Sequence, residues 1–150
     1  VSDLNGAASN LGLCATGARA LFIAGFTKAS SAPCQAMEDS LWASYPSATS
    51  LRVFAVMELQ GVPAFLIPLI RHSVRSKTPP ARWTRVFLER RGRAALESYF
   101  EYTDADPNDA YVALLDAHGR LLWSGHGHGK SGFLERVRKA VEERESPKMP

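Results

Sequence analysis

The fold is decided by one stretch near the carboxyl end of the chain, Tyr111-Val-Ala-Leu-Leu-Asp-Ala-His-Gly-Arg-Leu-Leu-Trp-Ser124. Two apolar runs flank a short turn that contains Asp116 and Gly119, and this pattern predicts a β-hairpin. The segment from Ser131 to Glu143 has the apolar spacing of an amphipathic helix. We therefore expect the chain to end in a hairpin followed by a helix.

Upstream of the hairpin, apolar runs alternate with segments of helical spacing. We expect strands at 19–26, 51–59 and 84–89 and helices at 34–45, 64–76 and 94–102. The second strand follows a helix, so we expect it to lie parallel to the first by a right-handed crossover. The element order β-α-β-α-β-(α)-β-β-α predicts an α/β, thioredoxin-like fold, in which a mixed sheet carries helices on both faces.

Length and composition favour one soluble globular domain. The chain has 150 residues, of which 45% are hydrophobic and 22% are charged, as is usual for such domains. We expect a single domain over 1–144 and a frayed polar tail over 145–150. The apolar run at 62–70 contains two prolines and is shorter than the ~20 residues that span a bilayer. The chain starts at Val1 without a charged-then-apolar leader, so we expect that a targeting segment was removed or trimmed.

The place of the redox motif holds one cysteine. In thioredoxin-like enzymes, Cys-x-x-Cys stands where the loop after a strand enters a helix, because the helix N-terminus stabilises a thiolate. Ser31-Ala-Pro-Cys34 occupies that place here. Because the serine cannot supply a thiolate and Cys34 stands at the inner position, we interpret Ser31 and Cys34 as a degenerate redox site. We expect no catalytic residue, no cofactor and no enzyme activity.

Two further features bear on redox chemistry. A cis-proline precedes the third strand of catalytic thioredoxins, and by sequence order that place falls near Trp83, after Pro79 and Pro80. We therefore expect no such proline. Cys14 could approach Cys34, although two buried, inert thiols are the simpler interpretation.

The stretch Ser124-Gly-His-Gly-His-Gly-Lys-Ser131 resembles a phosphate-binding loop at its end only. Ser124 stands where that motif needs its first glycine, and no strand is predicted after Lys130. We expect no nucleotide binding. No carboxylate or cysteine in this glycine loop completes a metal site with His126 and His128, so we also expect no metal.

Basic residues gather between 71 and 93, where Glu89 is the one acid. A solvated basic face is one interpretation, with Trp83 packed beneath the turn at Pro79 and Pro80. The other is a surface that binds an anionic partner through arginine and tryptophan anchors. Its candidate residues are Arg71, Arg75, Arg82, Trp83 and Arg85.

Two segments resemble one family. Thr78-Pro-Pro-Ala-Arg-Trp-Thr-Arg-Val-Phe-Leu-Glu-Arg-Arg-Gly92 and Tyr111-Val-Ala-Leu-Leu-Asp-Ala-His-Gly-Arg-Leu-Leu-Trp-Ser-Gly125 are similar to the mitochondrial ATP synthase assembly factor that chaperones the membrane-embedded a subunit. Met57-Glu-Leu-Gln60 is similar to that family's stretch after its second strand. The resemblance covers the chain from about residue 51 onward, and it departs at Leu122, where the family usually carries a basic residue.

This resemblance implies a non-enzymatic protein that assists assembly of the mitochondrial ATP synthase, or is bound within it or a related inner-membrane complex. The implied partner is the a subunit or another subunit, at the matrix face of the inner membrane. Peripheral contact with anionic lipid would suit the basic segment, and we expect no nucleic acid as a partner. The alternatives are a thiol-dependent oxidoreductase or peroxidase that uses Cys34, with or without Cys14, and a binding module with an unrelated partner.

Overall fold

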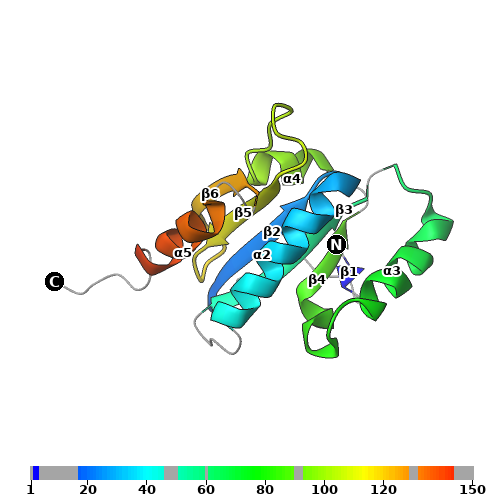
Figure 1. Ribbon diagram of the computed structural model, residues 1–150, viewed down its shortest axis with the longest axis horizontal. Helices are drawn as coiled ribbons and strands as arrows, with labels where there is room; N and C mark the ends of the chain where they lie inside the picture. The colour runs from blue at the N-terminus through cyan, green and yellow to red at the C-terminus, as the bar shows by residue number, and fades with distance from the viewer. Residues whose placement is uncertain are drawn as a thin grey trace.

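The computed structural model describes residues 2–3, 17–45, 51–59, 61–89, 93–128 and 132–143. Its centre is a six-stranded sheet in the order β1-β4-β3-β2-β5-β6 (Figure 1). The strands are β1 (Ser2–Asp3), β2 (Arg19–Gly25), β3 (Leu51–Glu58), β4 (Val86–Glu89), β5 (Ala110–Leu115) and β6 (Leu121–Gly127). β2, β3 and β4 run parallel, whereas β1, β5 and β6 pair antiparallel with their neighbours. The expected mixed sheet is confirmed.

Helices cover both faces of this sheet, as the sequence predicted. Helices α2 (Ser31–Ser44) and α5 (Phe133–Glu143) pack on one face against alternate residues of β2, such as Leu21 and Ile23. Helix α4 (Arg93–Tyr99) packs on the other face with Phe22 and Ala24. The central strand is thus buried on both sides, which explains why it reads as one apolar run without alternation.

The hairpin forms as expected. Tyr111 of β5 pairs with His126 of β6, and the turn is closed by two backbone N–H groups that donate to the Asp116 carboxylate at 2.8 and 2.9 Å. Gly119 has a φ of +81°, which glycine adopts without steric cost. The sequence signal was strong here because the apolar runs and the turn chemistry agree.

Several predicted boundaries were wrong. Helix α2 begins at Ser31, three residues earlier than expected, because the 3-10 turn η1 (Lys28–Ser30) leads directly into it. Residues 84–85 belong to the 3-10 helix η3 (Pro80–Arg85), so β4 is shorter than predicted. Strand β6 continues to Gly127 and places His126 in the sheet rather than in a glycine loop. Sequence analysis missed β1, which has two residues.

Helix α3 (Ile67–Ser76), preceded by the 3-10 turn η2 (Ala64–Leu66), lies at the β4 edge, away from α2 and α5 (Figure 1). Ile67 and Val74 pack against the small cluster of Ala55, Val86 and Leu88, and no side chain of α3 is fully buried. Across the described ranges, each helix is too short or too polar to cross a bilayer.

Candidate functional site

The turn between β2 and α2 lies at the carboxyl end of the central strand. Thr27 and Ser30 close η1 reciprocally, because Ser30 N donates to Thr27 Oγ1 at 3.2 Å and Thr27 N donates to Ser30 Oγ at 3.3 Å. Ser30 Oγ also donates to the Thr27 carbonyl at 2.6 Å and is buried. These bonds satisfy the buried hydroxyl and fix the entry into α2.

Cys34 lies in the first turns of α2, over the end of β2, as the sequence analysis expected of an inner-position cysteine. Its Sγ is 3.0 Å from the point where a Cβ on Gly25 would stand, so the missing side chain makes room for the sulfur. Cys34 is half-buried and Ser31 is exposed. Burial raises the pKa of the Cys34 thiol to about 12, the charge of Glu38 acts in the same direction, and a hydrogen bond with the Ser30 side chain opposes both. The thiol is therefore protonated at neutral pH.

Glu38, which sequence analysis missed, follows Cys34 by one helical turn and shares its face of α2. Burial raises the pKa of this carboxyl to about 7, although Arg82 lowers it and Asp39 raises it further. A carboxyl that titrates near neutrality can accept or return a proton under physiological conditions. The available signal was the i, i+4 spacing of cysteine and glutamate, but only the structure shows that this glutamate is half-buried.

The segment that enters β5 completes this end of the sheet. Ala24 pairs with Tyr111, and Thr27 Oγ1 donates to Asn108 Oδ1 at 2.7 Å, so the residues before β5 lie beside the β2–α2 turn. Asp109 rather than a proline enters β5, and the described residues contain no cis peptide bond. Trp83, near which the sequence placed the proline position, lies in η3 directly before β4.

Among the predicted partner-binding residues, Arg75 and Trp83 contact one another. The Arg75 guanidinium lies 4.2 Å from the centroid of the Trp83 ring, and Trp83 Nε1 donates to the Thr78 carbonyl at 2.9 Å. Trp83 is half-buried and packs against the Ala55, Val86 and Leu88 cluster. These contacts give both residues a structural role.

Arg82 and Arg85 turn toward α2 rather than toward Arg75. Arg82 Nη1 donates to Asp39 Oδ1 at 2.9 Å, and its guanidinium lies 5.1 Å from the centroid of the Trp42 ring. Arg85 lies 5.0 Å from the centroid of the Phe54 ring and 6.0 Å from that of Trp42. Of the five predicted residues, Arg71 and Arg75 thus lie on α3. The other three lie on η3, and two of them, Arg82 and Arg85, face α2. Arg71 is half-buried on α3.

Three predicted features lie outside the described residues. They are Cys14, the alternative partner for Cys34, Lys130 with Ser131 of the glycine loop, and the tail expected over 145–150.

The solved structures that this chain resembles share its fold. They include the pneumococcal exposed lipoprotein thioredoxin from Streptococcus pneumoniae, with a TM-score of 0.66 and 12% identity over 95% of this chain and 96% of that one. A putative thiol:disulfide interchange protein DsbE from Chlorobium tepidum has a TM-score of 0.58 and 16% identity over 87% and 82%. BsSco, a member of the Sco family of cytochrome c oxidase assembly proteins, has a TM-score of 0.55 and 14% identity over 94% and 90%.

No family model matches the chain, and no curated protein matches it. The comparisons thus support the thioredoxin-like fold and give no support to membership of the ATP synthase assembly-factor family. They also overturn the prediction that the protein is not an enzyme, because the similar structures are named as thioredoxins and thiol:disulfide interchange proteins. That prediction relied on Ser31, on the inner position of Cys34, on the missing proline before the third strand and on the family resemblance. At 12 to 16% identity the likeness establishes the fold, so activity is a matter for proposal.

Proposed function

We propose that this protein is a thiol-dependent oxidoreductase in which Cys34 exchanges disulfides with a partner protein and Glu38 accepts the thiol proton. The observation that carries the proposal is the position of Cys34 at the start of α2, one turn before a half-buried carboxyl whose pKa is about 7. Similar structures named as thiol:disulfide interchange proteins support it. Ser31 limits the site to a one-cysteine reaction.

The reaction balances without a second cysteine at the site. The Cys34 proton passes to Glu38 as the sulfur attacks one sulfur of a partner disulfide, so that no free thiolate has to form beforehand. A bond forms between Cys34 and that sulfur, the partner S–S bond breaks, and the leaving thiolate takes up the proton. Cys34 is thereby oxidised to a mixed disulfide and the departing sulfur is reduced. A second thiol, from the partner or a small-molecule thiol, then attacks the mixed disulfide and releases Cys34.

In a Cys14→Ser background, exchange with a pyridyl disulfide probe is expected to be absent after Cys34→Ser and about 100-fold slower after Glu38→Gln at pH 8. Below pH 7 the Glu38 carboxyl is mostly protonated and cannot accept the thiol proton, so the rate should rise from pH 6 to pH 8 and then level off. The Gln variant should lack this plateau. Stopped-flow absorbance measures the rate.

The direction of the Glu38→Gln effect distinguishes two roles. The Glu38 charge raises the pKa of Cys34, so a purely electrostatic role would make the Gln variant react faster. A proton acceptor makes it slower. Asp39→Asn is the matched control at pH 8. It removes a neighbouring carboxylate that is exposed and paired with Arg82. Loss of Asp39 lowers the pKa of Glu38, which is already mostly ionised at pH 8, so the rate should be nearly unchanged. A faster Gln variant refutes the proton-acceptor role, and an unreactive Cys34 in the folded protein refutes the oxidoreductase.

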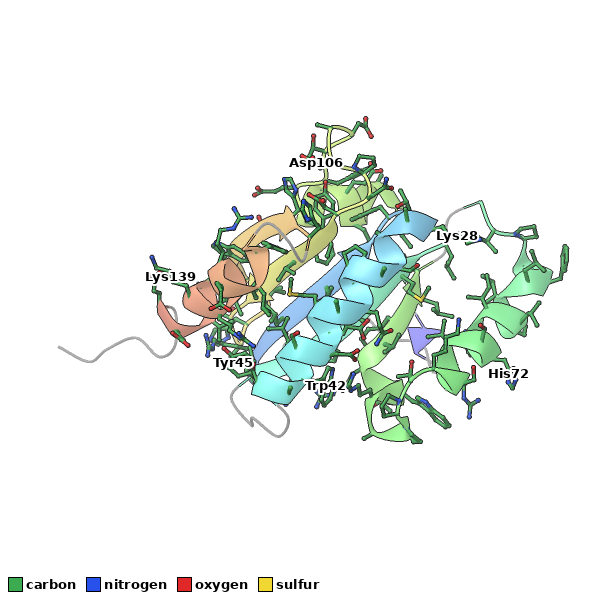
Figure 2. All side chains as sticks on the ribbon, in the orientation of Figure 1. Lys28, Trp42, Tyr45, His72, Asp106 and Lys139 are labelled. Atoms are coloured by element: carbon green, nitrogen blue, oxygen red, sulfur yellow. The ribbon has the colours of Figure 1, made fainter. Side chains whose placement is uncertain are left out.

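A second candidate is attachment to an inner-membrane complex during its assembly. We propose the ATP synthase a subunit as partner and the matrix face of the inner mitochondrial membrane as location, as the family resemblance implies. The observation that favours this candidate is the outer face of η2 and α3. Phe65 is 78% exposed and Leu69 is 65% exposed. Exposed His72 follows Leu69 at helical spacing and lies on the same face. Figure 2 shows His72 on the side of α3 that points away from the sheet.

The charge around this face suits an anionic surface. No acid occurs between Glu58 and Glu89, whereas Arg71, Arg75 and Lys77 belong to or follow α3. Each basic group near an anionic bilayer contributes about 1 kcal/mol of attraction. Apolar side chains flanked by cations are the usual composition of a membrane-surface helix, and a thioredoxin-fold assembly protein has a precedent in the name of the Sco family.

Phe65→Ser with Leu69→Ser is expected to weaken binding to phosphatidylserine-containing vesicles by about tenfold or more, because both side chains lose apolar burial. Co-sedimentation measures binding, with pure phosphatidylcholine vesicles and vesicles that carry the a subunit as further arms. Leu121→Ser is the control, since Leu121 is exposed on β6. Unchanged binding in the folded double variant excludes α3 from the membrane contact. Binding that occurs only with vesicles that carry the a subunit means that the partner is the a subunit rather than the lipid.

A further inference from the structure

Three potential metal ligands meet beside the carboxyl end of β2. A carboxylate oxygen of Asp106, one of Asp109 and a ring nitrogen of His126 all lie within 4.8 Å of one another. The aspartates come from the loop before β5 and the histidine from β6, so they are far apart in sequence. The glycine loop around His126 contains no carboxylate or cysteine, so the sequence near His126 does not indicate this cluster.

The sheet register brings His126 to this loop. His126 pairs with Tyr111, whose ring stacks on the imidazole with centroids 4.8 Å apart. Asp109 lies two residues before Tyr111, and its Oδ2 is 2.9 Å from His126 Nδ1. The stack and this contact hold the imidazole beside the Asp109 carboxylate, and an ion bound by both groups would replace the hydrogen bond between them.

Hydrogen bonds hold the loop that carries the aspartates. The buried Tyr111 hydroxyl donates to the Asp106 carbonyl at 2.9 Å and accepts from Thr103 N at 3.3 Å. Asn108 is bonded to Thr27 on the far side of the loop. Figure 2 shows Asp106 at the same end of the molecule as Lys28, whereas Tyr45 lies at the other end of α2. A loop that is already ordered loses little entropy when it binds an ion.

Charge gives an independent reason for a cation. The Asp109 side chain is only 17% exposed, and its one ion-pair partner in the described part of the chain is His126. Asp106 forms no ion pair there with lysine or arginine. Within the described residues, His126 is thus the only ion-pair partner of these two carboxylates, while Arg136 Nη2 donates to the His126 carbonyl at 3.3 Å, and a cation held by both carboxylates would neutralise their charge.

We propose that Asp106, Asp109 and His126 form a binding site for a divalent transition-metal cation of the Zn²⁺ class. Bonds of ~2.0–2.2 Å to such an ion place neighbouring ligand atoms about 3 Å apart, and Asp109 and His126 already have that spacing. Asp106 is exposed, and its carboxylate oxygen lies within 4.8 Å of the other two ligand atoms, so a side-chain rotation would bring it to the ion. One imidazole with two carboxylates favours Zn²⁺ over Mn²⁺ and Mg²⁺, and water completes the coordination.

The test is isothermal titration calorimetry with Zn²⁺, Mn²⁺ and Mg²⁺ on a Cys14→Ser, Cys34→Ser protein, whose metal binding cannot involve either thiol. We expect saturable Zn²⁺ binding that falls about tenfold or more with His126→Gln or Asp109→Asn. His128→Gln is the matched control and should have no effect. The result is independent of the thiol reaction proposed above.

A second measurement covers variants that fail to fold. In the same background with all four histidines present, Zn²⁺ should shift or broaden the NMR signals of the His126 ring and leave those of His72 and His118 unchanged. Absence of saturable Zn²⁺ binding overturns the proposal. So does binding that survives loss of His126, or a Zn²⁺ effect on other histidine rings instead.

Discussion

Replacing Phe22 with alanine is expected to lower the free energy of unfolding by about 3–5 kcal/mol. Phe22 is fully buried on the central strand, and its ring stacks on Phe54 with centroids 4.9 Å apart. Phe54 in turn stacks on Phe87 at 5.6 Å, so one row of rings joins β2, β3 and β4. The truncation leaves a cavity in the middle of this row. Urea denaturation followed by circular dichroism measures the loss.

The matched control is Phe65→Ala, which removes the same side chain from a position that is 78% exposed. Its effect on unfolding should stay within about 0.5 kcal/mol. A Phe22→Ala protein that is destabilised no more than this control would contradict the central position of β2. The comparison also separates the core from the proposed membrane face, because Phe65 is expected to matter for lipid binding alone.

The order of the larger elements could be read from the sequence where local signals and burial agree. The run around Phe22 is apolar because the strand is covered on both faces, and the hairpin turn carries Asp116 and Gly119, whose chemistry suits it. Element ends were less predictable. The α2 start depends on the hydrogen bonds between Thr27 and Ser30. Because Thr27, Ser30 and Ser31 are all residue types that cap helices, the sequence does not single out one start.

The candidate sites were harder to predict because their residues are joined by tertiary contacts. Cys34 could be placed by motif position, but the role of Glu38 depends on burial that pattern alone does not show. Asp109 meets His126 only through the pairing of β5 with β6. Conversely, Trp83 and Arg82 were candidates for binding a partner protein or membrane. In the structure, Trp83 is hydrogen-bonded to Thr78 and Arg82 is paired with Asp39.

Gly25→Ala is expected to destabilise the protein by about 1–3 kcal/mol and to make Cys34 more reactive. A Cβ at this position would stand 2.5 Å from Ser30 Oγ and 3.0 Å from Cys34 Sγ. The Ser30 hydroxyl cannot move away without losing its bonds to Thr27, so we expect the start of α2 to shift and expose the thiol. Chemical denaturation and the rate of alkylation by iodoacetamide measure the two effects.

A double-mutant cycle of Gly25→Ala with Ser30→Ala tests whether the collision between the added Cβ and Ser30 Oγ causes the loss of stability. Ser30→Ala removes the Oγ that collides with the new methyl group, so the two substitutions together should cost less than the sum of their separate effects, by about 0.5–3 kcal/mol. Gly61→Ala is the control for backbone strain, because Gly61 has a φ of +89° and no atom within 4 Å of the added Cβ. It should cost about 1 kcal/mol and leave Cys34 alkylation unchanged. Strict additivity in the cycle would mean that Gly25 is not what seats Ser30 and Cys34 against the end of β2.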